Sequence, residues 1–157
     1  MTSELTRYFL IDTNVLINSV DLNEGIRAQL ATNVIRTLVD AGRAAVSTQV
    51  IVEFFDATTR RKSRPFPIFT PSQAAKAVEE VLGSFRCIEI TQAAVEDAVR
   101  CAQQYQMRIY DAQIWAVAKH SGIAFVLTED LPSQPEIEGV RYVNPFAPAF
   151  RLEHIGL

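Results

Sequence analysis

The stretch Tyr8-Phe9-Leu10-Ile11-Asp12-Thr13-Asn14 decides the fold of this chain. Its apolar residues lead directly into an acid, which two small polar residues follow. An unbroken apolar run that ends in turn-forming residues predicts a strand buried on both faces, in the middle of a parallel sheet. Asp12 then lies at the carboxyl end of that strand, where open α/β sheets bind their ligands. Asp is also a favoured N-cap, so the role of Asp12 depends on which other acids occupy equivalent positions.

The rest of the chain alternates apolar strands with amphipathic helices. Helical patterns begin near residues 15, 26, 49, 71, 91 and 110, and strand patterns cover about 44–46, 87–90, 124–127 and 140–143. This alternation predicts a parallel sheet with helices on both faces and right-handed crossovers. We therefore predict an α/β/α sandwich around a central, mainly parallel sheet of about five strands. The expected unit is one domain over residues 1–157, with a core at about 8–146 and a tail at 147–157.

Composition restricts the class of protein. The 157 residues are 48% hydrophobic and carry a formal charge of −3, which excludes a disordered chain and a protein that binds nucleic acid through bulk positive charge. Cys87 and Cys101 lack a metal-type spacing, so we expect two reduced core thiols. The N-terminus lacks the apolar core of a signal peptide, and no segment approaches a membrane span, so we expect a cytoplasmic protein.

Acidic residues recur at equivalent places in the pattern. Asp12 and Asp130 follow the first and fourth predicted strands, whose carboxyl ends lie at the same sheet edge. Helices that follow strands begin above this edge, and two of the expected helices carry Glu53 and Asp111 near their starts. These four acids are therefore expected to converge, with Glu129 as a possible fifth. Converging carboxylates repel one another, and a hard divalent cation such as Mg²⁺ or Mn²⁺ relieves that repulsion.

Other candidate residues carry weaker signals. His120 and His154 stand alone, so a zinc site is not expected. Trp115 and Phe125 are interpreted as core residues. A basic run after Glu53 fits either RNA contact or a solvated helix end, and Arg108 fits either a phosphate contact or a salt bridge with Asp111. The candidate RNA-binding residues are Arg60, Arg61, Lys62, Arg64 and Arg108.

Four segments in order carry a resemblance to a known family: I-D-T-N at residues 11–14, V-x-x-E-F at 50–54, Y-D-A-Q-I-W-A-V-A at 110–118 and V-L-T-E-D-L at 126–131. Together they resemble the PIN-domain ribonucleases, and most of all the VapC-type toxins of prokaryotic toxin–antitoxin pairs. The resemblance covers about residues 8–146.

The resemblance implies a PIN-like fold and metal-dependent hydrolysis of RNA phosphodiester bonds. It also implies a cognate antitoxin. The apolar excess of the helices at 26–42 and 71–85 fits either core or a dimer or antitoxin surface, and we expect a homodimer. Its metal-site acids correspond to Asp12, Glu53, Asp111 and Asp130, which would bind Mg²⁺ or Mn²⁺. Its supporting polar positions correspond to Asn14 and Thr128.

Four other functions are weighed against this one. A receiver-like phosphotransfer domain would have paired acids at the end of the first strand, but Ile11 precedes Asp12. A haloacid-dehalogenase-like phosphatase would have D-x-D, but residue 14 is Asn. A PIN-fold RNA-processing nuclease without an antitoxin, or a non-catalytic metal- or RNA-binding module, would keep the same fold.

Overall fold

The computed structural model describes residues 7–61 and 64–157. Within them, strands β1 (Phe9–Ile11), β2 (Ala44–Ser47), β3 (Arg86–Ile88), β4 (Phe125–Leu127), β5 (Glu136–Ile137) and β6 (Val140–Val143) form one sheet in the order β3-β2-β1-β4-β6-β5. Only the β5–β6 pairing is antiparallel. The predicted α/β sandwich with a mainly parallel sheet is confirmed, and β1 lies inside the sheet with every residue buried.

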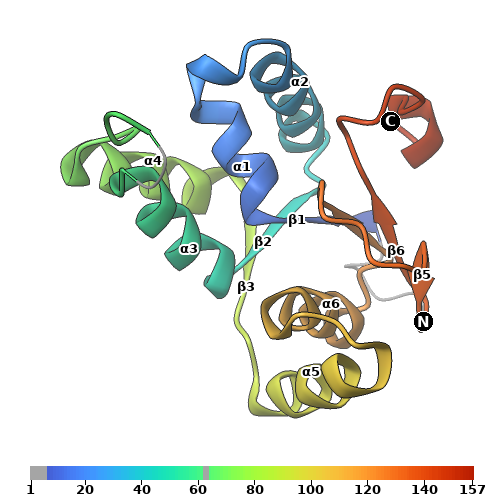
Figure 1. Ribbon diagram of the computed structural model, residues 1–157. Coiled ribbons are helices and arrows are strands. Elements are labelled where there is room, and N and C mark those ends of the chain that lie inside the picture. Colours follow the sequence, from blue (N-terminus) through green and yellow to red (C-terminus); the bar gives the residue numbers. More distant parts are fainter. Residues whose placement is uncertain (1–6, 62–63) are drawn as a thin grey trace.

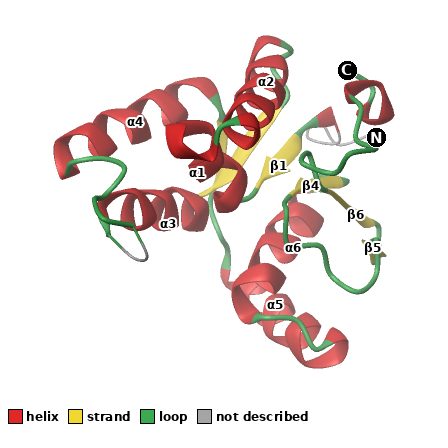
Figure 2. Cartoon of the chain, turned by 45° about the horizontal axis from the view of Figure 1, so that its top comes forward, coloured by secondary structure: helices red, strands yellow, loops and turns green. Residues whose placement is uncertain are grey.

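The helices cover the sheet from both sides. Figure 1 shows α1 (Thr13–Val20) and α2 (Ile26–Asp40) on one side of the strands, and α5 (Gln92–Tyr105) and α6 (Ile109–Ser121) on the other. Helices α3 (Thr48–Thr59) and α4 (Pro71–Ser84) form a pair beside α1, which Figure 2 shows from a second direction. Two short 3₁₀ helices, η2 (Leu22–Glu24) and η3 (Leu152–Ile155), complete the described elements.

Local sequence signals set most helix ends. Ser47 caps α3 by accepting a hydrogen bond from the Val50 amide, and Thr70 and Gln73 form a capping box at the start of α4. Gly122 ends α6 in the left-handed conformation that glycine tolerates. Helix α4 continues through Gly83 to Ser84, and the chain becomes extended only at Phe85.

The sheet has one strand more than the predicted five. Glu136–Ile137 pairs with Val140–Val143 around a two-residue turn at Glu138 and Gly139, both with positive φ, as a tight hairpin requires. Two residues are too few to show an alternating pattern in the sequence. The C-terminal segment, whose structure the sequence left open, packs back on the core through Ile155.

The core agrees with the predicted apolar faces only in part. Phe54, Ile114 and Trp115 are buried as expected, and the Trp115 indole N–H donates to the Ile137 carbonyl at 3.0 Å. Cys101 is buried and Cys87 half-buried, both as free thiols. By contrast, Ile26 at the start of α2 is 74% exposed, although Ala28 in the same turn is buried.

None of the helices in the described part of the chain combines the length and apolar character needed to cross a bilayer.

Candidate metal centre

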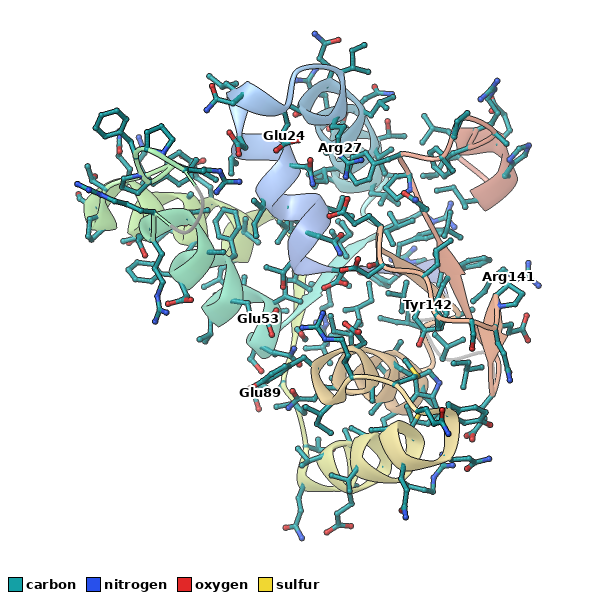
Figure 3. The ribbon with its side chains drawn as sticks, viewed as in Figure 1. Glu24, Arg27, Glu53, Glu89, Arg141 and Tyr142 are labelled. Atoms are coloured by element: carbon teal, nitrogen blue, oxygen red, sulfur yellow. The ribbon has the colours of Figure 1, made fainter. Side chains whose placement is uncertain are left out.

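The four predicted acids line one cavity at the carboxyl edge of the sheet. The cavity has a volume of about 360 Å³ and is lined by Asp12, Glu53, Asp111 and Asp130, together with Asn14. Asp12 comes from the end of β1, and Glu53 lies on α3, where Figure 3 labels it. Asp111 lies in the first turn of α6, and Asp130 follows β4. Parallel strands bring these chain segments together, as the sequence predicted.

Asp12 is the buried member of the group. Its side chain caps α1 and accepts hydrogen bonds from the Thr13 amide at 2.6 Å and the Thr128 hydroxyl at 2.8 Å. The residue is 8% exposed, and burial raises the pKa of its carboxyl to about 6, although the Thr128 and Thr13 hydrogen bonds act in the opposite direction. The negative charges of Asp111 and Glu53 also raise it. Asp12 is therefore both a helix cap and a cavity residue.

The pKa of Asp111 is also raised. Burial is the largest cause, and the charges of Asp130 and Glu53 add to it, whereas Arg108 lowers the pKa. The carboxylates of the cavity therefore raise the pKa values of Asp12 and Asp111.

Asn14 and Thr128 link the first and fourth strand ends. The Asn14 amide nitrogen donates to Thr128 Oγ1 at 3.0 Å, and to Asp12 and Asp130 carboxylate oxygens at 3.3 Å each. Thr128 in turn accepts from the Asp130 amide at 3.1 Å. These contacts hold the Asp12 carboxylate in one orientation and Asp130 beside it.

Two residues that the sequence did not single out hold Glu53. The Thr13 hydroxyl donates to Glu53 Oε2 at 2.7 Å, and the Gln49 amide donates to Oε1 at 2.6 Å. Gln49 lies four residues before Glu53, one turn away on α3, and Thr13 adjoins Asp12. That spacing is the signal that could have identified Gln49.

Glu129 does not line this cavity. Its carboxylate forms an ion pair with Arg27 in a neighbouring cavity, and Figure 3 labels Arg27 at the start of α2. Its backbone amide donates to Asn14 Oδ1 at 3.2 Å. The chain bends at Glu129 and Asp130, just after β4, and the two side chains enter different cavities.

The candidate RNA-binding residues occupy different environments. Arg108 lines the acidic cavity. Arg61 is exposed, Arg60 pairs with Asp56 at 2.6 Å, and Arg64 pairs with the buried Asp21 at 2.6 Å. The prediction for Lys62 concerns a residue outside the described part of the chain.

The donor set suits a hard divalent cation. Among the described residues, no three His, Cys, Asp or Glu side chains are close enough to enclose a metal ion by themselves. An open group of carboxylates instead matches Mg²⁺, which retains several waters and binds through one or two carboxylates. The buried carboxylate with a raised pKa, beside other negative charges, is what an added cation would stabilise.

The family model of the PIN domain matches residues 9–131, which is most of the chain. The fold, the strand-end acids and this match define the class of protein: the chain belongs to the PIN domain family. No curated protein sequence matches it at a significant level.

Solved structures share the fold over most of their length. A toxin–antitoxin complex from Klebsiella pneumoniae is 24% identical with a TM-score of 0.63, and the match covers 87% of this chain and 97% of that one. The DNA-bound VapBC of Salmonella typhimurium is 16% identical with a TM-score of 0.65, covering 88% and 98%. VapC20 of Mycobacterium tuberculosis, a toxin that cleaves the sarcin–ricin loop, is 18% identical with a TM-score of 0.58, covering 75% and 86%. At these identities the likeness establishes a common fold.

Proposed function

We propose that this chain is a Mg²⁺- or Mn²⁺-dependent endoribonuclease, acting as the toxin of a prokaryotic toxin–antitoxin pair. The observation that carries the proposal is the convergence of Asp12, Glu53, Asp111 and Asp130 on one cavity. A bound divalent cation would lower the pKa of a coordinated water and neutralise charge that develops on the phosphate.

The protein's own residues have separate tasks in this reaction. Asp12 and Asp111 would hold the ion, and Glu53 and Asp130 would orient water or hold a second ion. Thr128 and Asn14 orient the Asp12 carboxylate through hydrogen bonds at 2.8 and 3.3 Å. Thr13 and Gln49 fix both oxygens of Glu53, so that neither must be immobilised when substrate arrives. Arg108, at the wall of the cavity, contacts the RNA phosphate.

An RNA cleavage assay tests this function. With Mg²⁺ or Mn²⁺, the wild-type protein should cleave a mixed RNA population, and EDTA should stop it. Asp12→Asn and Asp111→Asn should each lose about 100-fold or more in rate, because several kcal/mol of transition-state stabilisation depends on the ion. Asp40→Asn, an exposed acid at the end of α2, is the matched control and should keep full activity. Equal cleavage by wild type and both site variants would refute the assignment.

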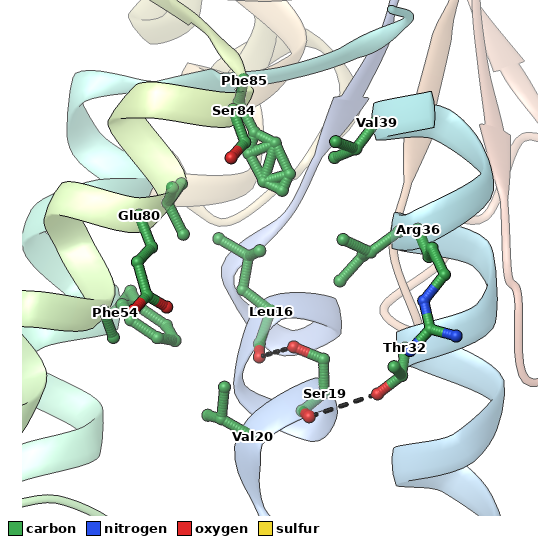
Figure 4. A pocket seen from close by; sticks show the side chains of 13 residues that line it. Leu16, Ser19, Val20, Thr32, Arg36, Val39, Phe54, Glu80, Ser84 and Phe85 are labelled. Carbon is green, nitrogen blue, oxygen red and sulfur yellow. Dashed lines mark hydrogen bonds between the residues drawn. The ribbon is translucent and has the colours of Figure 1, made fainter. Parts of the chain in front are cut away.

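We propose an antitoxin as the protein partner, with an apolar segment that occupies a groove between α1, α2 and α4. Figure 4 shows the groove, which has a volume of about 280 Å³ and apolar walls that include Leu16, Val39 and Phe85. Three solved structures of this fold are described as complexes of a toxin with its antitoxin or of VapBC. A basic side chain of the partner would pair with the carboxylates and compete with metal or RNA. A complex whose partner lies far from Asp12 and Asp111 would contradict this inhibitory mechanism.

We also propose that the chain forms a homodimer. Leu22, Ile26 and Leu30 are exposed along η2 and α2, at 87%, 74% and 39%. Burying such a row against a second copy removes apolar area from water. Sedimentation equilibrium should show a dimer that Ile26→Glu weakens; a monomer at all concentrations would contradict the proposal.

A further inference from the structure

A second cavity adjoins the acidic one. It has a volume of about 350 Å³, within the usual range for small-ligand pockets, and it shares Arg108, Asp111 and Asp130 with the acidic cavity. Its remaining walls come from the end of α5 and the turn that follows it, from the loop that joins β4 to β5, and from Ile137 of β5 and Tyr142 of β6. A ligand group there would lie directly beside whatever the carboxylates hold.

Tyr142 supplies a polar group without a partner in this cavity. The residue is 8% exposed, and among the described residues none forms a hydrogen bond with its hydroxyl. Figure 3 shows Tyr142 and the exposed Arg141 on opposite sides of β6. A buried hydroxyl that lacks a hydrogen bond is unfavourable, so a polar ligand atom that reaches it would supply the missing hydrogen bond.

The other walls combine apolar side chains with amides. Met107, Leu131 and Ile137 provide apolar surface, and Gln106 and Gln134 provide amide groups. Gln106 has a φ of 53°, a left-handed conformation that is uncommon outside glycine. It adopts this conformation because it ends α5 as the C-cap, with its backbone N–H donating to the Ala102 carbonyl.

We propose that this cavity, the Tyr142 pocket, binds the nucleobase next to the scissile phosphate, and so selects the RNA sequence that is cut. A nucleobase has two apolar faces and a polar edge, and the pocket offers apolar walls, amides and a buried hydroxyl. The shared Arg108 would hold the flanking phosphate in the adjoining cavity. The inference rests on the proposed nuclease function for its substrate.

Binding of mononucleotides tests the pocket without requiring catalysis. The wild-type chain in Mg²⁺ is titrated with the four nucleoside 5′-monophosphates and with ribose 5-phosphate, which lacks a base. At least one nucleotide should bind about tenfold more tightly than ribose 5-phosphate, and it should shift the amide resonances of Gln106, Leu131 and Gln134. The base contribution is the ratio of the nucleotide affinity to the affinity for ribose 5-phosphate. Tyr142→Phe should reduce this ratio about fivefold, the effect of one hydrogen bond, and leave the affinity for ribose 5-phosphate unchanged.

Tyr8→Phe, at the start of β1, is the matched control and should change neither affinity. Equal binding of all nucleotides and ribose 5-phosphate would overturn the inference, as would an unchanged base contribution in Tyr142→Phe. Monophosphates contain no phosphodiester bond, so the two proposals fail separately. If the chain selects a base but never cleaves RNA, the pocket proposal stands and the nuclease proposal is refuted. If the chain cleaves RNA but binds nucleotides no more tightly than ribose 5-phosphate, only the pocket proposal is refuted.

Discussion

At the scale of single residues, Asp12 combines a structural and a chemical task. It caps α1 through the Thr13 amide and lines the acidic cavity. Its burial raises its pKa to about 6, so the folded protein holds this proton more tightly than the unfolded chain does. Ionising Asp12 therefore lowers the free energy of unfolding. This loss is absent below the unfolded pKa of about 4 and grows as the pH rises through the folded pKa. A metal-free site is therefore least favourable at neutral pH.

This reasoning predicts a pH-dependent difference between wild type and Asp12→Asn. In EDTA, wild type should lose about 2 kcal/mol of unfolding free energy relative to the variant between pH 4 and pH 7. Urea unfolding of both proteins across this range measures the difference, and Asp40→Asn should follow wild type. A constant difference between wild type and Asp12→Asn at all pH values would show that Asp12 is an ordinary cap with an ordinary pKa.

Arg64 illustrates where sequence reasoning about a charged run reaches its limit. The run of basic residues suggests RNA contact, but the Arg64 guanidinium pairs at 2.6 Å with Asp21, which is only 2% exposed. Long-range partners of this kind are invisible in a local pattern. The strand-end acids, by contrast, could be predicted, because strand order alone determines where they lie.

The ion pair between Arg64 and Asp21 predicts that Arg64→Gln is less stable than wild type. Removing the cation leaves the Asp21 carboxylate buried without its counter-charge, which should lower the free energy of unfolding by about 2–4 kcal/mol. Thermal and urea unfolding measure the loss. Arg61→Gln, an exposed neighbour, is the control and should stay within about 0.5 kcal/mol of wild type. A fully stable Arg64→Gln would argue that the carboxylate is hydrated or protonated.

At the scale of elements, a charge network joins α5, α6 and the β5–β6 turn. Glu138 accepts hydrogen bonds from Arg100 at 3.0 Å and from Lys119 at 2.7 Å, and these donors lower the pKa of its carboxyl to about 2. Asp97 contacts the same two cations. The network secures the short hairpin, which ends the loop that carries Asp130.

Acid unfolding tests this network. A carboxyl with a lowered folded pKa contributes stability above its unfolded pKa of about 4.3 and loses it as pH falls towards the folded value. Glu138→Gln should therefore melt lower than wild type at pH 7, and the gap should narrow between pH 5 and pH 2. Melting curves across this range provide the measurement, with Glu136→Gln as the exposed control. If the difference in melting temperature between wild type and Glu138→Gln does not change with pH, the lower stability of the variant comes from packing and not from charge.

Helix periodicity predicted the existence of the elements better than their buried faces. The apolar side chains of α5 include Ala94 and Ala98, which are buried, and also Val95 and Val99, which are 40% and 57% exposed. An apolar stripe wider than the contact with its neighbours leaves its flanks in water. The width of that contact depends on α6 and the sheet, which lie outside the helix's own sequence.

At the scale of the whole molecule, the chain is acidic, with a formal charge of −3. RNA must therefore be bound by individual positive side chains and not by the net charge of the protein. Arg61 is exposed and Arg108 lines both cavities, so these two are the cations best placed for phosphate. Arg61→Gln and Arg108→Gln should each weaken RNA binding and reduce the slope of log affinity against log salt by about one unit or less.

Fluorescence anisotropy with a labelled RNA at several salt concentrations measures these slopes. Arg86→Gln, at the amino end of β3 and so at the opposite sheet edge, should leave the slope unchanged. An unchanged slope in both test variants would place the RNA elsewhere on the surface.

The central claim is that the sheet brings four acids together as a divalent-ion site. The most direct measurement is the melting temperature of wild type, Asp12→Asn and Asp111→Asn, each in EDTA and in Mg²⁺ or Mn²⁺. Binding to the folded state adds about 2.7 kcal/mol when metal is at one hundred times its Kd, so wild type should melt several degrees higher with metal. Both variants should gain much less. A wild type that gains nothing from metal, or variants that gain as much as wild type, would contradict the site and remove the physical basis of the proposed nuclease.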